Sequence, residues 1–223
     1  MTEPNIKRLW KKDSFQTIVM IATIIVVVFT LWFGTQFALG TQYPALAVAS
    51  GSMCTTQHMT CDGYSHPFEH TLHIGDLIIV QGVDPKAISA AYPDSDIIVF
   101  HKPRNPEELI VHRVVAKEEI NGTFYFRTKG DGNGRNRWPE TPDSSEYDDW
   151  LIPQDLVVGR VVMRIPWIGH VALFLRNSSG MYVIIAFIIL LVVIELALPL
   201  LRGKKPEAKP EESAKGDSEP KDL

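Results

Sequence analysis

Two apolar runs near the ends of the chain constrain its fold more than any other feature. Residues 15–39 contain no charged side chain, and residues 181–201 contain one, Glu195. Each run reaches the roughly 20 residues that a helix needs to cross the hydrocarbon core of a bilayer. The first run is longer than the roughly 7–15 apolar residues of a signal-peptide core, so we expect an uncleaved anchor. The sequence therefore predicts two transmembrane helices.

Basic side chains flank both runs on the sides that face the chain ends. They are Lys7, Arg8, Lys11 and Lys12 before the first run, and Arg202, Lys204 and Lys205 after the second. The excess of positive charge on cytoplasmic flanks places residues 1–14 and 202–223 in the cytoplasm and residues 41–180 on the far side. Residues 202–223 are rich in Lys, Glu and Pro and predict a disordered tail. We therefore expect a multi-pass protein of the cell membrane.

The exported region, residues 41–180, carries 12 Lys and Arg against 17 Asp and Glu, a net charge of −5. Nucleic-acid binding depends on clustered positive charge that neutralises phosphates. The negative balance of this region argues against a nucleic acid as its partner.

The chain has two cysteines, Cys54 and Cys61, and both lie in the exported region. They are expected either to form a disulfide, which an oxidising compartment would favour, or to remain free thiols. Four histidines follow within the next residues of the chain: His58, His66, His70 and His73. The Cys-x6-Cys spacing matches no strong zinc pattern, and we expect no metal.

The pattern of the exported region is mainly β. Short runs rich in β-branched residues and bounded by Gly, Pro, Asn and Asp predict five strands. These are Leu77–Gln81, Asp96–Phe100, Leu109–Val115, Thr123–Thr128 and Leu156–Met163. Asn121-Gly122 predicts a hairpin turn, and no helix of convincing length is expected between the apolar runs. Residues 164–176 are apolar and include Trp167, and they fit a segment at the bilayer surface, a last strand with core contacts, or both.

Two serines, Ser50 and Ser52, flank Gly51 shortly after the first apolar run. A serine hydroxyl needs a neighbouring base to become a nucleophile. Of the seven histidines, His112 stands out because it interrupts an apolar strand, where the sheet would fix its position. Taken alone, His112 also fits a core histidine satisfied by a backbone carbonyl.

A glycine-rich stretch, TKGDGNG at 128–134, directly follows a predicted strand. Its simplest interpretation is a turn. It is not a phosphate-binding loop, because it lacks the Gly-Lys-Ser/Thr ending and a following helix. An aspartate in such a turn, Asp131, is suited to orient an imidazole and to stabilise its protonated form.

Four motifs in this order resemble the type I signal peptidases, in the archaeal and endoplasmic-reticulum branch where histidine replaces a lysine base. They are SGSM at 50–53, GDLIIV at 75–80, IVHRVV at 110–115 and TKGD at 128–131. The resemblance implies that Ser52 is the nucleophile and that His112 is the general base. It also implies that Ser50 and the backbone N–H of Ser52 form the oxyanion hole, and that Asp131 is the first aspartate of an acidic motif.

The second aspartate of that motif normally follows about six residues later, where this chain has Arg137. Residues 135–150 look like an insertion. Counting from both flanking motifs favours Asp143, with Asp148 second and Asp149 third. A further insertion after Met53 is expected to lengthen a loop near the substrate groove.

The resemblance implies a fold and a function. The fold is a mainly β, extracytoplasmic, signal-peptidase-like domain at 41–180, flanked by transmembrane helices at 15–39 and 181–201. The function is that of a serine endopeptidase that cleaves signal peptides from exported pre-proteins, without a cofactor. Its expected partners are those signal peptides, the lipid bilayer and the protein-translocation channel. The alternatives are a non-enzymatic exported β-domain and a self-cleaving serine protease of related fold, which usually uses a Ser–Lys pair.

Overall fold

The computed structural model describes residues 13–55, 61 and 71–201. The chain divides into two units, Met1–Asn177 and Ser178–Leu223. The first unit contains helix α2 (Asp13–Leu39), a β-sheet and helix α3 (Ile168–Arg176). The second contains helix α4 (Ser178–Leu201).

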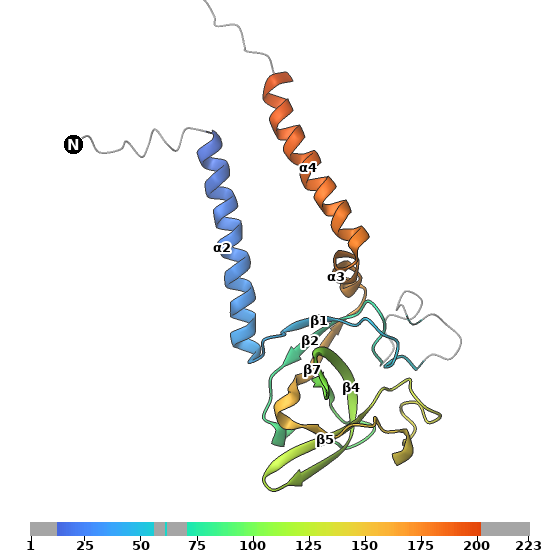
Figure 1. Ribbon diagram of the computed structural model, residues 1–223. Helices are drawn as coiled ribbons and strands as arrows, with labels where there is room; N and C mark the ends of the chain where they lie inside the picture. Colours follow the sequence, from blue (N-terminus) through green and yellow to red (C-terminus); the bar gives the residue numbers. More distant parts are fainter. Residues whose placement is uncertain (1–12, 56–60, 62–70, 202–223) are drawn as a thin grey trace, which may run out of the picture. The chain divides into compact units, whose positions relative to one another are not determined.

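The sheet of the first unit has seven strands in the order β1-β2-β7-β3-β4-β5-β6, and every pairing is antiparallel. Figure 1 shows α2 leading into β1, with β2 beside it. The strands are β1 (Ala45–Ala47), β2 (Leu77–Gln81), β3 (Ile97–Lys102), β4 (Asn105–Ile120), β5 (Thr123–Lys129), β6 (Ile152–Pro153) and β7 (Val157–Ile165). Three short 3₁₀ helices lie between strands: η1 (Pro85–Ala87), η2 (Ser144–Glu146) and η3 (Gln154–Leu156).

Strand β4 is the longest and pairs with β3 along its first part and with β5 along its second. The β4–β5 hairpin turns at Asn121 and Gly122, which both have positive φ, 52° and 79°. Positive φ at both central residues matches the twist of antiparallel strands, and Asn-Gly is the pair that adopts it at least cost. The predicted hairpin is confirmed.

Alternate residues of β3 pack into two hydrophobic clusters. Val99 belongs to a cluster that includes Met53 and Ile78, while its neighbours Ile98 and Phe100 belong to a second. Successive side chains of a strand point to opposite faces, so both faces of the sheet are covered at β3. Burial on both faces explains why this strand has an almost continuous apolar sequence.

The five predicted strands are present as β2, β3, β4, β5 and β7, with ends that differ by a few residues. Strands β1 and β6 were missed, because each has at most three residues and carries little periodic signal. The expectation of a last strand within residues 164–176 is wrong beyond Ile165, because α3 occupies Ile168–Arg176. The expectation that no helix lies between the two apolar runs is also wrong, because α3 lies there.

Helix α2 covers the first predicted span, and its apolar side chains are exposed all round. A helix that is apolar on every side and not buried in protein is suited to a lipid environment. Among the described helices, α2 is by itself long and apolar enough to cross a membrane, over Gln16–Leu39. Helix α3 and residues Ser178–Leu191 of α4 meet the same criterion only when they are counted together.

Cys54 and Cys61 form a disulfide, which settles the alternative that the sequence left open. The bridge joins the segment that follows Ser52 to a residue whose carbonyl accepts a hydrogen bond from the Ile74 N–H at 2.6 Å. Closing this short loop restricts the unfolded chain and ties the segment after Ser52 to the turn before β2.

Replacing both cysteines, Cys54→Ser with Cys61→Ser, should lower the free energy of unfolding by about 2–3 kcal/mol, the entropy of closing a loop of this size. Thermal unfolding followed by tryptophan fluorescence measures the effect. Reductant should destabilise the parent protein and leave the double variant unchanged. Equal melting temperatures for the parent with and without reductant would contradict this role of the bridge.

Candidate active site

Ser52 lies in a turn just after β1, and backbone hydrogen bonds fix this segment. Val48 N–H donates to the Asp76 carbonyl and Gly75 N–H donates to the Val48 carbonyl, both at 2.9 Å. Met53 is 1% exposed and packs in the first hydrophobic cluster. An anchored residue on each side thus holds the Ser52 hydroxyl at the surface of the sheet.

His112 lies on β4, with its side chain 8% exposed. Its Nε2 is 3.1 Å from Ser52 Oγ, and its Nδ1 is 2.7 Å from Asp148 Oδ2. A carboxylate only accepts hydrogen bonds, so the Asp148 contact places the imidazole proton on Nδ1. The Nε2 lone pair then accepts the proton of the Ser52 hydroxyl. The imidazole is therefore placed to act as a base toward Ser52.

Asp148 comes from the segment after η2 and is tied to β5. Its N–H donates to the Thr128 carbonyl at 2.9 Å, and the Thr128 hydroxyl donates to Asp148 Oδ2 at 2.6 Å. The same oxygen accepts from His112 Nδ1. Because two donors bind the same oxygen, the Asp148 carboxylate is fixed in position, and it in turn fixes the plane of the His112 imidazole.

Asp143, the aspartate that counting favoured, lies elsewhere. It is exposed and caps η2, with its carboxylate accepting from the Ser145 N–H at 2.9 Å. This hydrogen bond lowers the pKa of Asp143. Asp149 follows Asp148 and is also exposed. Of the three candidates, the structure brings Asp148 to His112.

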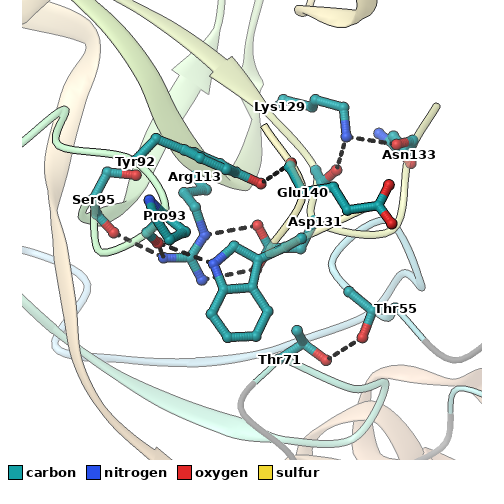
Figure 2. A network of polar contacts seen from close by, with 12 residues as sticks. Thr55, Thr71, Tyr92, Pro93, Ser95, Arg113, Lys129, Asp131, Asn133 and Glu140 are labelled. Carbon is teal, nitrogen blue, oxygen red and sulfur yellow. Dashed lines mark hydrogen bonds and ion pairs between the residues drawn. The ribbon is translucent and has the colours of Figure 1, made fainter. Parts of the chain in front are cut away.

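Asp131 faces Arg113 rather than the imidazole. Its two oxygens accept from Nε and Nη2 of Arg113 at 2.8 and 2.9 Å, and Figure 2 shows the guanidinium also reaching the Ser95 carbonyl. Burial raises the pKa of Asp131, and the Arg113 charge acts against that rise. Arg113 follows His112 on β4, and successive side chains point to opposite faces, which explains the separate partners of His112 and Asp131.

Aromatic side chains border the Arg113–Asp131 pair. The Trp138 ring lies 5.2 Å from the Arg113 guanidinium carbon, and its Nε1 donates to the Pro93 carbonyl at 3.0 Å. Burial, followed by the charge of Asp131, raises the pKa of Tyr92 to about 12. Tyr92 therefore stays protonated at neutral pH, and its hydroxyl donates to the Glu140 carbonyl at 3.0 Å (Figure 2).

The glycine-rich turn packs directly on the segment that carries Ser52. Gly132 N–H donates to the Ser52 carbonyl at 2.9 Å. A Cβ on Gly130 would lie 2.5 Å from that carbonyl oxygen and 3.0 Å from His112 Nε2, and one on Gly132 would lie 2.0 Å from the Cys54 carbonyl oxygen. Glycine is thus required here for close approach between the turn and the Ser–His pair.

Lys129 and Glu146 hold the base of this turn, and sequence reasoning missed both. Lys129 is 2% exposed, and its Nζ donates to the Asn133 and Asn136 carbonyls at 2.6 and 2.7 Å. Glu146 accepts from the Arg135 N–H at 2.8 Å. Burial lowers the pKa of Lys129, while the Arg135 hydrogen bond lowers that of Glu146. No motif in the sequence marks these contacts, because they depend on how residues 130–146 fold back.

Ser50 lies beside the candidate nucleophile, with its Oγ 3.4 Å from Ser52 Oγ. Its side chain is exposed, and Ser50 and Ser52 line the same cleft. A hydroxyl at this position is suited to donate to an oxygen that develops negative charge when Ser52 attacks a carbonyl.

A cleft of about 500 Å³ opens beside Ser52 and His112. One wall is the segment from Leu46 to Ser50, and the other is residues 107–112 of β4. Trp150 and Arg176 also line it. The part of β4 that lines the cleft precedes Arg113, where pairing with β5 begins. The cleft thus runs along strand segments that have a free edge, a suitable site for an extended peptide.

Among the described residues, no group of three or more His, Cys, Asp or Glu side chains is arranged to hold a metal ion. Three of the histidines considered for zinc, His58, His66 and His70, lie outside those residues.

A serine hydroxyl that donates to an imidazole, itself oriented by a carboxylate, is the arrangement of a serine hydrolase. Comparison with known proteins narrows this class. The chain is 29% identical to the signal peptidase complex catalytic subunit SEC11C of Homo sapiens over 177 residues, which cover 78% of each protein. It is 28% identical to SEC11C of Mus musculus with the same coverage. It is 26% identical to SEC11 of Tuber melanosporum, over 79% of this chain and 87% of that protein.

The chain is therefore homologous to the catalytic subunits of signal peptidase complexes, at modest identity over most of its length. The resemblance drawn from the four motifs is confirmed. No family model matches the chain.

Proposed function

We propose that the protein is a membrane-bound serine endopeptidase that removes signal peptides from exported pre-proteins. The observation that carries the proposal is the hydrogen-bonded series Ser52–His112–Asp148, of which Ser52 and His112 line the cleft. Homology to signal peptidase catalytic subunits supports the same reaction. The rival of a non-enzymatic β-domain gives no reason for three polar side chains to converge in this way.

In this mechanism Ser52 Oγ attacks the carbonyl carbon of the residue before the cut while His112 Nε2 takes the hydroxyl proton. The carbonyl oxygen becomes negative and accepts hydrogen bonds from the Ser50 hydroxyl and the Ser52 N–H. When the C–N bond breaks, the imidazolium gives its proton to the leaving amine. Water, deprotonated by the same imidazole, then hydrolyses the acyl-enzyme. Asp148 stabilises the imidazolium at both stages, and the mechanism uses no cofactor.

Substrates would bind in the cleft as an extended strand. The segments 46–50 and 107–112 offer backbone groups on both sides, and main-chain hydrogen bonds would give affinity with little demand on sequence. The resemblance to signal peptidases implies that such substrates have small residues just before the cut. Binding through main-chain hydrogen bonds suits substrates that have an extended segment in common but differ in sequence.

The membrane placement belongs to the same proposal. Helix α2 would anchor the catalytic domain, residues 41–180, outside the cytoplasm, and residues 181–201 would cross the bilayer a second time before the cytoplasmic tail. Only five residues separate α2 from β1, so the active site would stay close to the bilayer that holds the apolar core of the signal peptide. The protein-translocation channel, which delivers such substrates, is a fitting partner.

The direct test is to incubate the detergent-solubilised protein with a labelled pre-protein. Cleavage of the pre-protein at its signal-peptide junction is the expected result. Cleavage of the enzyme alone would indicate the self-cleaving rival, and the absence of any cleavage would indicate a non-enzymatic domain. Ser145→Ala, which changes an exposed serine of η2, is the matched control for serine variants.

Asp148→Asn should slow turnover by about 10⁴-fold, because the amide cannot stabilise the imidazolium and permits the wrong tautomer. Asp143→Asn, the same change at the exposed cap of η2, should leave turnover unchanged. Initial rates on one pre-protein measure both. A normal Asp148→Asn enzyme beside an impaired Asp143→Asn enzyme would reverse the proposed assignment.

Ser50→Ala should slow turnover by about 10²–10³-fold, the usual loss when one oxyanion donor is removed. The loss should fall on kcat more than on KM, since the donor acts on the charged transition state. Some activity should remain because the Ser52 N–H is retained. A Ser50→Ala enzyme with an unchanged kcat would exclude the oxyanion role.

A further inference from the structure

The turn of the β4–β5 hairpin carries a motif that the proposed function does not use. Asn121-Gly122-Thr123 matches Asn-x-Ser/Thr, the acceptor sequence for N-linked glycans in exported proteins. The hairpin explains Asn121 and Gly122, because both have positive φ. It does not explain the hydroxyl of Thr123, since any β-branched residue suits the first position of β5. The backbone of the turn therefore accounts for only part of the motif.

The acceptor groups of this motif are open to modification. Asn121 and Gly122 are exposed, and a Cβ on Gly122 would have no heavy atom within 4 Å. Within the part of the chain that the structure describes, no hydrogen bond or ion pair occupies the Asn121 amide or the Thr123 hydroxyl. Strand β4 pairs with β3 only as far as Arg113, so the tip of the hairpin, residues 118–123, has no strand on that side. The tip thus has room for a bulky group on Asn121.

The turn is also remote from the candidate active site. His112 lies on β4, and the strand continues for about 25 Å to its end at Ile120, at 3.3 Å per residue. The part of β4 that lines the cleft is residues 107–112, on the far side of His112 from the turn. A group attached at the turn would therefore not obstruct a peptide in the cleft.

A second motif of this kind, Asn177-Ser178-Ser179, differs in its structure. The Asn177 N–H donates to the Leu173 and Phe174 carbonyls at 3.2 Å and ends α3. Ser178 and Ser179 already belong to the apolar helix α4. Glycans are attached to segments at a free surface, such as turns and loops, and a segment that continues at once into an apolar helix is a poor acceptor. The two motifs therefore provide an internal comparison.

We propose that Asn121 is an N-glycosylation site, which receives an oligosaccharide from a lipid-linked donor. The amide nitrogen of Asn121 forms a bond to the first carbon of the sugar, and the bond between that carbon and the lipid phosphate oxygen breaks. The amide loses one proton, and the lipid phosphate leaves. The inference rests on the proposed placement of residues 41–180 outside the cytoplasm, where such glycans are added, and it does not depend on the peptidase activity.

The full chain can be tested by translation in the presence of endoplasmic-reticulum microsomes, which supply the donor and the transferase. We expect a form that migrates more slowly on denaturing gels and returns to the unmodified mobility after peptide-N-glycosidase treatment. Thr123→Val should abolish this form, because valine keeps the β-branched shape and lacks the hydroxyl. Thr123→Ser, which keeps a hydroxyl, should retain it, and Asn177→Gln should leave it unchanged.

A relocated motif separates the site from the compartment. Thr123→Val combined with Asp143→Asn gives the sequence Asn-Ser-Ser at the exposed start of η2, and this variant should regain a glycosidase-sensitive form. Modification of this variant without modification of the parent would overturn Asn121 as the site. Absence of modification in both would overturn the inference together with the proposed placement of residues 41–180. A glycan that persists in Thr123→Val and is lost in Asn177→Gln would also overturn it.

Activity distinguishes this inference from the proposed function. Thr123→Val should cleave a pre-protein in detergent at the parent rate, since the turn lies far from Ser52 and His112 along β4. A parent protein that is glycosylated at Asn121 and cleaves no pre-protein would refute the proposed function and support the glycosylation site. A parent protein that cleaves the pre-protein and carries no glycan would do the reverse.

Discussion

Ser52→Ala should abolish processing of a pre-protein, with a loss on the order of 10⁶-fold in kcat, as expected when the nucleophile of a Ser–His pair is removed. The structure explains why the fold should survive. Ser52 Oγ contacts His112 Nε2 and Ser50 Oγ, whereas the backbone on either side is held by Val48 and by the buried Met53. Removing one partly exposed hydroxyl creates no buried cavity.

The measurement is the initial rate of cleavage with the parent, Ser52→Ala and Ser145→Ala proteins in the same detergent. Circular dichroism and membrane insertion should be equal in all three. Ser52→Ala that processes at the parent rate would remove the basis for the mechanism, and an inactive Ser145→Ala would show that the assay reports folding rather than catalysis.

His112→Ala should cause a loss of similar size, because the hydroxyl of Ser52 then has no base and the two residues act as one unit. The double variant with Ser52→Ala should be no slower than either single variant. His112→Lys should not restore activity, since an ammonium group is protonated at neutral pH and cannot take the Ser52 proton. The longer lysine side chain would also need a drier pocket and has a different reach. His101→Ala is the control, because His101 lies on β3 and contacts the Pro106 carbonyl.

The pH dependence follows from the same geometry. The Nε2 lone pair is the acceptor for the Ser52 proton, so protonation of His112 removes the base and kcat/KM should fall toward acid pH. The pH profile of kcat/KM on one pre-protein measures this fall. A rate that does not fall on the acid side would contradict His112 as the base.

Much of this protein follows from local sequence. The two apolar runs predict the helical segments because membrane length and absence of charge are properties of contiguous residues. Strands β2, β4 and β5 are predictable from runs of β-branched residues, and the hairpin is predictable from Asn121-Gly122. Each of these features is set by residues that are adjacent in the sequence. The proximity of Ser52 and His112, 60 residues apart, could be inferred only by resemblance to a family.

The tertiary structure decided which charged residues meet. Counting along the chain favoured Asp143, but η2 turns that carboxylate outward, whereas the tie to Thr128 brings Asp148 to His112. His112 and Arg113 are neighbours on β4 and point to opposite faces, so Asp131 pairs with the Arg113 guanidinium and not with the His112 imidazole. Both outcomes depend on how residues 130–148 fold back on the sheet, and the spacing of residues along the chain does not predict that path.

Helix α3 illustrates the same division. Its sequence, apolar with one tryptophan, fits both a strand and an interfacial segment, because nine residues carry too little periodicity to distinguish them. Packing decided the matter, since Gly169 and His170 of the helix lie in close contact with the turn at Gly75 and Asp76. The sequence by itself determined the two long apolar helices, the main strands and the residue types available for catalysis. The contacts between segments distant in the chain determined the partners of those residues, because such contacts depend on how loops fold back and not on local propensity.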